Sequence, residues 1–174
     1  MDVSRIEIRK IVKLFLGNKI GVVPTDTVYG IHCLAGNKEL RRKIAELKGR
    51  SEGMPYIYLI PKSYDIGNFD IVGDFSIYTN KYWPGPNTII FPVRDGSTVA
   101  LRVSDNGFLQ AILEETGPLV STSANPHKKM PARDVFTAKE YFGNMVDFYV
   151  DGGRLDNPPS NIYRVMDDIL VKIR

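Results

Sequence analysis

The chain has little of the side-chain chemistry that cross-links proteins or binds transition metals. Its 174 residues contain one cysteine, Cys33, and two histidines, His32 and His127. A single cysteine cannot form an internal disulfide, which excludes a disulfide-stapled scaffold. So few Cys and His side chains also argue against a zinc site built from them. Cys33 directly follows His32, and adjacent side chains of an extended segment point to opposite faces. We therefore interpret Cys33 as a packing residue.

Long apolar segments and a strong charge of one sign are missing as well. No apolar run approaches the ~20 residues that a transmembrane helix requires, and residues 1–7 carry charges where a signal peptide needs an apolar core. The net charge is only +3. Basic residues alternate with acidic ones, as in residues 39–43, a pattern typical of a solvated helix face. We expect a cytoplasmic protein that does not enter a membrane.

The composition is that of a globular domain. Hydrophobic residues make up 43% and charged residues 25% of the chain, which is enough apolar material to build a core and argues against disorder. The sequence has neither an internal repeat nor a low-complexity linker. We therefore expect one domain covering residues 1–174.

Hydrophobic periodicity gives a coarse map of the chain. Helices are expected over residues 5–16, 37–49, 74–82, 108–113 and 134–142, with Asn37 and Asp74 as N-caps. Strands are expected over residues 20–23, 56–60, 88–93, 98–103, 119–121, 148–150, 162–165 and 169–173. Strands and helices are interleaved, but some strands adjoin as hairpins. This order predicts an α/β fold with a mixed, twisted sheet and flanking helices.

A polar segment directly after a buried strand is the first candidate site. Residues 24–30 read Pro-Thr-Asp-Thr-Val-Tyr-Gly. Ligand-binding loops gather at the edge of a sheet, so these hydroxyls and this carboxylate could contact a ligand. The alternative is a capped turn, in which Thr25 or Asp26 bonds to the backbone.

Two cations flank a glycine at the expected end of the second helix. Lys48 offers a point charge and Arg50 a bidentate fork, which suits a phosphate clamp. The alternative is that both simply interact with the helix dipole. The chain has no Walker-type glycine loop, so a nucleotide site here would not be a P-loop.

Two further segments carry unusual residues. Residues 121–125 place three hydroxyls and an amide after a short strand, where they could bond phosphate oxygens or form a solvated turn. Residues 83–88 form a stiff, proline-rich loop, in which we interpret Trp83 as a core residue. From the residues alone, the prediction is an α/β domain with a polar cleft that can bind anions.

Taken together, these segments resemble the YrdC-like family, in the family's order and at about its spacing. Residues 24–30 match its PTDTVYG segment, residues 48–50 its KGR motif and residues 121–125 its TSAN segment. Residues 83–88 are similar to its WPGPLT loop, and residues 101–103 to its strand end reading RxP. Residues 151–153 with Ser160 resemble its DGG…S pattern, and Arg174 stands where the family has an arginine.

The resemblance implies an α/β fold around a large, positively charged cavity. It also implies synthesis of L-threonylcarbamoyl-AMP from L-threonine, bicarbonate or CO₂, and ATP, with release of pyrophosphate and use of Mg²⁺. Partner proteins of the family then transfer the threonylcarbamoyl group to tRNA, so tRNA is a further candidate partner. Some members carry a second domain, whereas this chain resembles the short form.

Site residues follow from the resemblance position by position. Those expected to bind ATP are Lys48, Arg50, Thr88, Ser123, Asn125, Ser160 and Arg174. Those expected to bind threonine are Thr25, Arg102 and Ser121. Lys48 and Arg50 are expected to act in catalysis at the phosphates, and no protein side chain is expected to bind a metal.

The sequence departs from the family pattern at several positions. Met54 replaces a lysine and Ser51 a proline after the KGR motif, and Ser104 stands where proline is usual after the strand end. Two alternatives therefore stay open. One is a YciO-type relative with a different nucleotide-linked activity, and the other is a non-catalytic RNA-binding module.

Overall fold

The computed structural model describes residues 5–50 and 55–174. Its helices are α1 (Arg5–Leu16), α2 (Lys38–Lys48), α3 (Ser76–Tyr82), α4 (Gly107–Thr116) and α5 (Val135–Phe142), with short 3₁₀ helices η1 (Ile66–Phe69) and η2 (Gly143–Met145). Its strands are β1 (Gly21–Pro24), β2 (Tyr29–Leu34), β3 (Ile57–Leu59), β4 (Asn87–Pro92), β5 (Thr98–Arg102), β6 (Leu119–Ser123), β7 (Phe148–Tyr149), β8 (Asn161–Met166) and β9 (Ile169–Lys172). Within these residues, no helix is both long and apolar enough to cross a bilayer.

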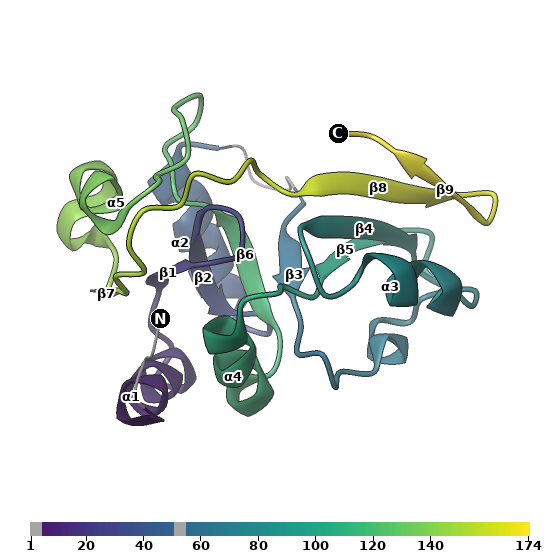
Figure 1. Ribbon diagram of the computed structural model, residues 1–174, viewed down its shortest axis with the longest axis horizontal. Helices are drawn as coiled ribbons and strands as arrows, with labels where there is room; N and C mark the ends of the chain where they lie inside the picture. The colour runs from purple at the N-terminus through teal and green to yellow at the C-terminus, as the bar shows by residue number, and fades with distance from the viewer. Residues whose placement is uncertain (1–4, 51–54) are drawn as a thin grey trace.

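The strands form one nine-stranded sheet in the order β7-β1-β2-β6-β3-β5-β4-β8-β9. The pairs β1–β7, β3–β5 and β4–β8 are parallel, and the remaining pairs are antiparallel. The expectation of a mixed, twisted sheet with flanking helices is therefore confirmed (Figure 1).

Three hydrophobic clusters hold the helices to the sheet. Helices α1 and α4, which lie side by side in Figure 1, bury Phe15 and Leu109 in one cluster. Helices α2 and α5 bury Ile44 and Phe142 in a second cluster, which also contains the fully buried Cys33. Cys33 is thus a packing residue, as expected. A third cluster joins α3 to β4, β5 and β8.

The structure adds a strand that the sequence interpretation missed. Residues 29–34 form β2, which pairs antiparallel with β1 and β6. The sequence does not indicate a strand at Tyr29 and Gly30, because the polar residues before them and His32 interrupt the apolar pattern. Residues 25–28 are instead the turn of a β1–β2 hairpin.

Two other boundaries also differ from expectation. Strand β6 continues to Ser123, so the hydroxyls of residues 121–123 lie on a strand rather than in a turn. They look loop-like in the sequence, but β6 pairs with β2 over all three residues and with β3 at Ser121, which keeps them extended. Helix α3 begins at Ser76 with Phe75 as its N-cap, so the expectation that Asp74 is the N-cap is wrong. Asp74 lies one residue earlier and accepts a hydrogen bond from the Ser76 N–H at 2.9 Å.

A close contact at Gly21 tests the packing between β1 and β7. A Cβ atom added at Gly21 would lie 2.1 Å from Cζ of Phe148, whose ring packs edge-on against Phe15. We expect Gly21→Ala to lower the free energy of unfolding by about 1–3 kcal/mol, the usual cost of overpacking, in urea denaturation. Gly36→Ala is the matched control, because an added Cβ there meets nothing within 4 Å. Equal stability of the two variants would contradict the packing argument.

Candidate functional site

Residues of β3, β4, β5, β6 and β8 line a cavity of about 880 Å³. On β5, Thr98, Ala100 and Arg102 line the cavity and Val99 also reaches it, whereas Leu101 packs under α3. Strands β4 and β8 follow the same two-residue period, because successive side chains of a strand point to opposite faces. The pattern that builds the core on one face therefore builds the cavity floor on the other.

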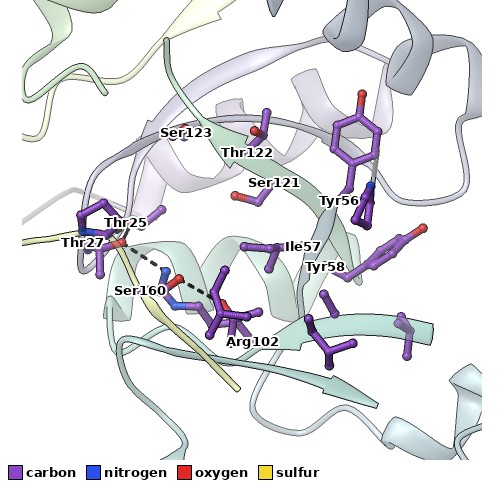
Figure 2. Close-up of a pocket in the computed structure, with 18 of the residues that line it drawn as sticks. Thr25, Thr27, Tyr56, Ile57, Tyr58, Arg102, Ser121, Thr122, Ser123 and Ser160 are labelled. Carbon is purple, nitrogen blue, oxygen red and sulfur yellow. Dashed lines mark hydrogen bonds between the residues drawn. The ribbon is translucent and has the colours of Figure 1, made fainter. Parts of the chain in front are cut away.

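The cavity brings together residues that are far apart in the sequence. Its lining includes these residues predicted from the sequence: Thr25, Thr88, Arg102, Ser121, Ser123, Ser160 and Arg174. Figure 2 shows Thr25 and Thr27 near Ser160 and Arg102, with Tyr56 and Tyr58 across the cavity. Lys48, Arg50 and Asn125, also predicted, are not among the described residues that line it.

The β1–β2 turn is held by its own hydroxyls. The Thr25 hydroxyl donates to the Val28 carbonyl at 2.8 Å and accepts from the Thr27 N–H at 3.0 Å. The capped-turn alternative is therefore correct for Thr25, and this same residue also lines the cavity. Tyr29 anchors the turn further, because its hydroxyl accepts from the Gly152 N–H and donates to the Gly153 carbonyl, both at 2.7 Å.

Arg102 lies at the cavity floor with most of its charge already paired. Its Nη2 lies 2.5 Å from Oδ1 of Asp26, and both side chains are largely buried. Its Nη1 donates to the Thr27 hydroxyl at 3.1 Å and its Nε to the Gly85 carbonyl at 3.2 Å. A buried guanidinium needs such partners, because an unpaired buried charge is strongly destabilising.

The opposite part of the lining is built by β4 and the chain around β8. The hydroxyls of Thr88 and Ser160 are buried and lie 3.0 Å apart. Arg174 donates from Nη2 to the Ser160 carbonyl at 3.0 Å, which brings the end of the described chain to the cavity. Trp83, in the preceding proline-rich loop, packs on Phe91 and donates its indole N–H to the Asn87 carbonyl at 2.7 Å.

Lys48 ties the end of α2 to the end of β6. Its ammonium donates to the carbonyls of Ser123 at 2.5 Å and Asn125 at 2.7 Å, and lies 3.2 Å from Oδ1 of Asn125. The Ser123 hydroxyl donates to that same Oδ1 at 2.5 Å. The KGR and TSAN segments thus form one polar cluster. In this arrangement the three protons of the ammonium are directed to protein oxygens, and the expected phosphate contact of Lys48 stays a prediction.

Arg50 lies beside this cluster and packs against an aromatic ring. Its guanidinium carbon lies 4.3 Å from the centre of the Tyr56 ring, and Nη2 donates to the Pro55 carbonyl at 3.1 Å. Tyr56 itself lines the cavity, so Arg50 lies directly behind one of its walls. Ser51 and Met54, at which the sequence departs from the family pattern, lie outside the described residues.

The cavity lining also contains four cations that were not predicted from the sequence, namely Lys38, Arg41, Arg42 and Arg164. Cationic side chains in its lining are Lys38, Arg41, Arg42, Arg102, Arg164 and Arg174, and none of the described lining residues is acidic. The α2 cations were expected on a solvated face, but Arg41 is half-buried and donates to the Tyr58 hydroxyl at 3.0 Å. Residues three and four positions apart share one face of a helix. The sequence could therefore have predicted that Lys38, Arg41 and Ala45 lie on the same face of α2. The lining therefore attracts anions.

This sheet and its cation-lined cavity define an α/β protein built to hold an anionic ligand. A sequence model of the Sua5/YciO/YrdC group, described as telomere recombination, matches residues 13–174. The chain belongs to the Sua5/YciO/YrdC family.

Relatives with named activities cover most of the chain. A threonylcarbamoyl-AMP synthase of Marinobacter nauticus is 35% identical in an alignment of 161 residues that covers 82% of this chain and 83% of the relative. A protein of the same name from Idiomarina loihiensis is 34% identical, over 82% of this chain and 90% of that one.

Solved structures share the fold at lower identity. The crystal structure of E. coli YciO is 23% identical with a TM-score of 0.87, over 99% of this chain and 90% of that one. The structure of P. abyssi Sua5 complexed with L-threonine is 22% identical with a TM-score of 0.88. The present chain is covered completely in that comparison but spans only 55% of the Sua5 chain.

The Lys48 cluster gives a test of stability. We expect Lys48→Met to lower the free energy of unfolding by about 2–3 kcal/mol, because it leaves the buried oxygens that accept from the ammonium without their charged donor. Urea denaturation measures the change. Lys43→Met on the exposed side of the same helix is the control and should remain near wild type. The interpretation of Lys48 as a structural tie is wrong if both variants are equally stable.

Proposed function

We propose that the protein is an L-threonylcarbamoyladenylate synthase. The observation that carries the proposal is the cavity, which joins six cationic side chains to a row of hydroxyls and contains no acidic residue among its described lining. Such a cavity suits a ligand with several negative charges, as ATP has. The names of the relatives from M. nauticus and I. loihiensis support the same activity.

The reaction can be written with all atoms accounted for. The amine of L-threonine and bicarbonate form a carbamate and release water. A carbamate oxygen then attacks the α-phosphorus of ATP, the bond to the β-phosphate oxygen breaks, and pyrophosphate leaves. No protein nucleophile is required, so the protein contributes positioning and charge stabilisation.

The nucleotide is proposed to bind in the cavity, where the cationic side chains can balance its phosphate charge. Thr88, Ser160, Arg174 and Ser123 would contact ATP from the cavity lining. Asn125, which lies outside the lining and accepts from the Ser123 hydroxyl, would join them there. Lys48 and Arg50 would act at the phosphates as negative charge grows on the leaving group. For Lys48 this requires exchange of one present hydrogen bond for a phosphate oxygen.

The floor near the β1–β2 turn is the proposed site of threonine. Arg102 would bind the threonine carboxylate, because a guanidinium with paired N–H groups matches the two carboxylate oxygens. Thr25 and Ser121 would bond the polar groups of the amino acid. Thr25 is well placed for this role, since its hydroxyl lies 3.0 Å from that of Thr27, a partner of Arg102.

Mg²⁺ is proposed as a companion of the nucleotide. Among residues 5–50 and 55–174, no group of three or more His, Cys, Asp or Glu side chains could hold a metal ion. Mg²⁺ commonly keeps its waters and binds through substrate phosphates, so it would enter with ATP. No step here is assigned to protein ligands of the ion.

The proposal includes the setting of the reaction. One domain, residues 1–174, would make the intermediate in the cytoplasm and pass it to proteins that transfer the threonylcarbamoyl group to tRNA. Direct binding of tRNA is not needed for the chemistry. It would show as RNA affinity that falls steeply with salt.

The direct test of this activity is release of pyrophosphate. With ATP, Mg²⁺ and bicarbonate present, release should depend on added L-threonine, and threonylcarbamoyl-AMP should appear in equal amount by mass spectrometry. ATP binding without release would favour a YciO-type relative with another substrate. Neither binding nor release, together with salt-dependent RNA affinity, would favour the RNA-binding module.

A pH profile tests the proposed role of Lys48. Burial lowers the pKa of Lys48 to about 8, and the nearby charge of Arg50 lowers it as well. The ammonium therefore loses its proton, and its charge, as pH rises through about 8. We expect kcat/KM for ATP to fall above that pH, at saturating L-threonine and bicarbonate. Lys48→Arg keeps its charge throughout this range, so the fall should be absent from its profile; the same fall in this variant would assign it to another group.

A further inference from the structure

A buried polar cluster lies behind Arg102, one layer below the cavity. Ser104 is fully buried, and its hydroxyl donates to Oδ1 of Asp26, the same oxygen that Nη2 of Arg102 approaches to 2.5 Å. The other carboxylate oxygen, Oδ2, is buried and has no hydrogen-bond partner in the described part of the chain. The whole charge of Asp26 is therefore held through one oxygen that two donors share.

Ser104 and Asp26 are themselves fixed from outside the cluster. The Ser104 carbonyl accepts from Nε2 of Gln110, on helix α4, at 3.1 Å. The Asp26 carbonyl accepts from Nδ2 of Asn157 at 3.0 Å. The carboxylate is thus held between the sheet, α4 and the segment before β8. Neither Asp26 nor Ser104 lines the cavity.

The cluster determines which N–H groups Arg102 can offer to a ligand. Three of the five N–H groups of a guanidinium are used here, by Asp26, Thr27 and Gly85. Within the part of the chain that the structure describes, one N–H of Nη1 and one N–H of Nη2 remain without a protein acceptor. A guanidinium that keeps an N–H on each terminal nitrogen has donors for both oxygens of a carboxylate.

We infer that Ser104 is a positioning residue for amino-acid binding, acting through Asp26 on Arg102. This inference rests on the proposed function, in which Arg102 holds the carboxylate of L-threonine. The Ser104 hydroxyl fixes the rotation of the Asp26 carboxylate, and the carboxylate fixes the plane of the guanidinium. Without that hydroxyl, Oδ1 has only Arg102 as donor and Oδ2 still has none. The carboxylate is then free to rotate, and the guanidinium keeps only Thr27 and Gly85 as fixed partners.

The test is a comparison of affinities in the full chain by calorimetry. Ser104→Ala should weaken L-threonine binding about tenfold, of the order expected when a hydrogen bond to a charged group is disturbed, and should leave ATP binding within twofold of wild type. In turnover, KM for threonine should rise by a similar factor while kcat and KM for ATP stay unchanged. Asp26→Asn, which keeps the shape but removes the charge, should show the same selective loss and serves if Ser104→Ala does not fold.

Ser63→Ala is the matched control. Its hydroxyl also donates to a carboxylate, that of Glu114, but at an exposed site, so its threonine affinity should equal that of wild type. Threonine affinity of Ser104→Ala equal to wild type overturns the inference and leaves the proposed function standing. Equal loss of threonine and ATP affinity also overturns it, because the effect is then general damage. Failure of the wild-type protein to bind threonine overturns both.

Discussion

The need to compensate buried positive charge shapes the cavity and the elements around it. Lys48 and Arg102 are both almost fully buried, and a buried cation is tolerated only when it is paired or fully hydrogen-bonded. Lys48 meets this need with carbonyls at the end of β6, which fixes the C-terminal end of α2 against the sheet. Arg102 meets it with Asp26 and Thr27, which fixes the β1–β2 turn over β5. Segments far apart in the sequence are therefore placed by the same electrostatic requirement.

The two cations solve this problem in different ways, and the difference bears on function. The ammonium of Lys48 has three protons and three oxygens around it, so its cluster is closed. The guanidinium of Arg102 has five N–H groups and keeps two after its protein partners are satisfied. A planar fork with spare donors can hold its place and still bind a ligand. The closed cluster of Lys48 must give up one hydrogen bond to reach a phosphate oxygen, whereas Arg102 can bind a ligand with its present partners in place.

Much of the fold could be predicted from the sequence, because hydrophobic residues recur at helix or strand spacing in most elements. Helices α1, α2 and α4 have apolar stripes, and Asn37 caps α2 through the Leu40 N–H at 3.0 Å, as expected. Strand β2 was missed because its pattern is not alternating: buried on both faces, it contains His32 and Gly30. The end of β6 was missed because hydroxyl residues look like a turn unless the two neighbouring strands are known.

Several residues of the cavity lining stand at motif positions, whereas Lys48, Arg50 and Asn125, also motif positions, do not line the cavity. Motif positions such as Thr25 and Ser160 line the cavity as a group. The cations of α2 were hidden by their acidic neighbours in sequence, although the helix turns Arg41 toward Tyr58 in the cavity lining and neither Glu39 nor Glu46 is part of that lining. A net charge of +3 gives no sign of this separation. Local charge depends on which side chains the fold brings to one wall, so an almost neutral chain can enclose a strongly cationic cavity.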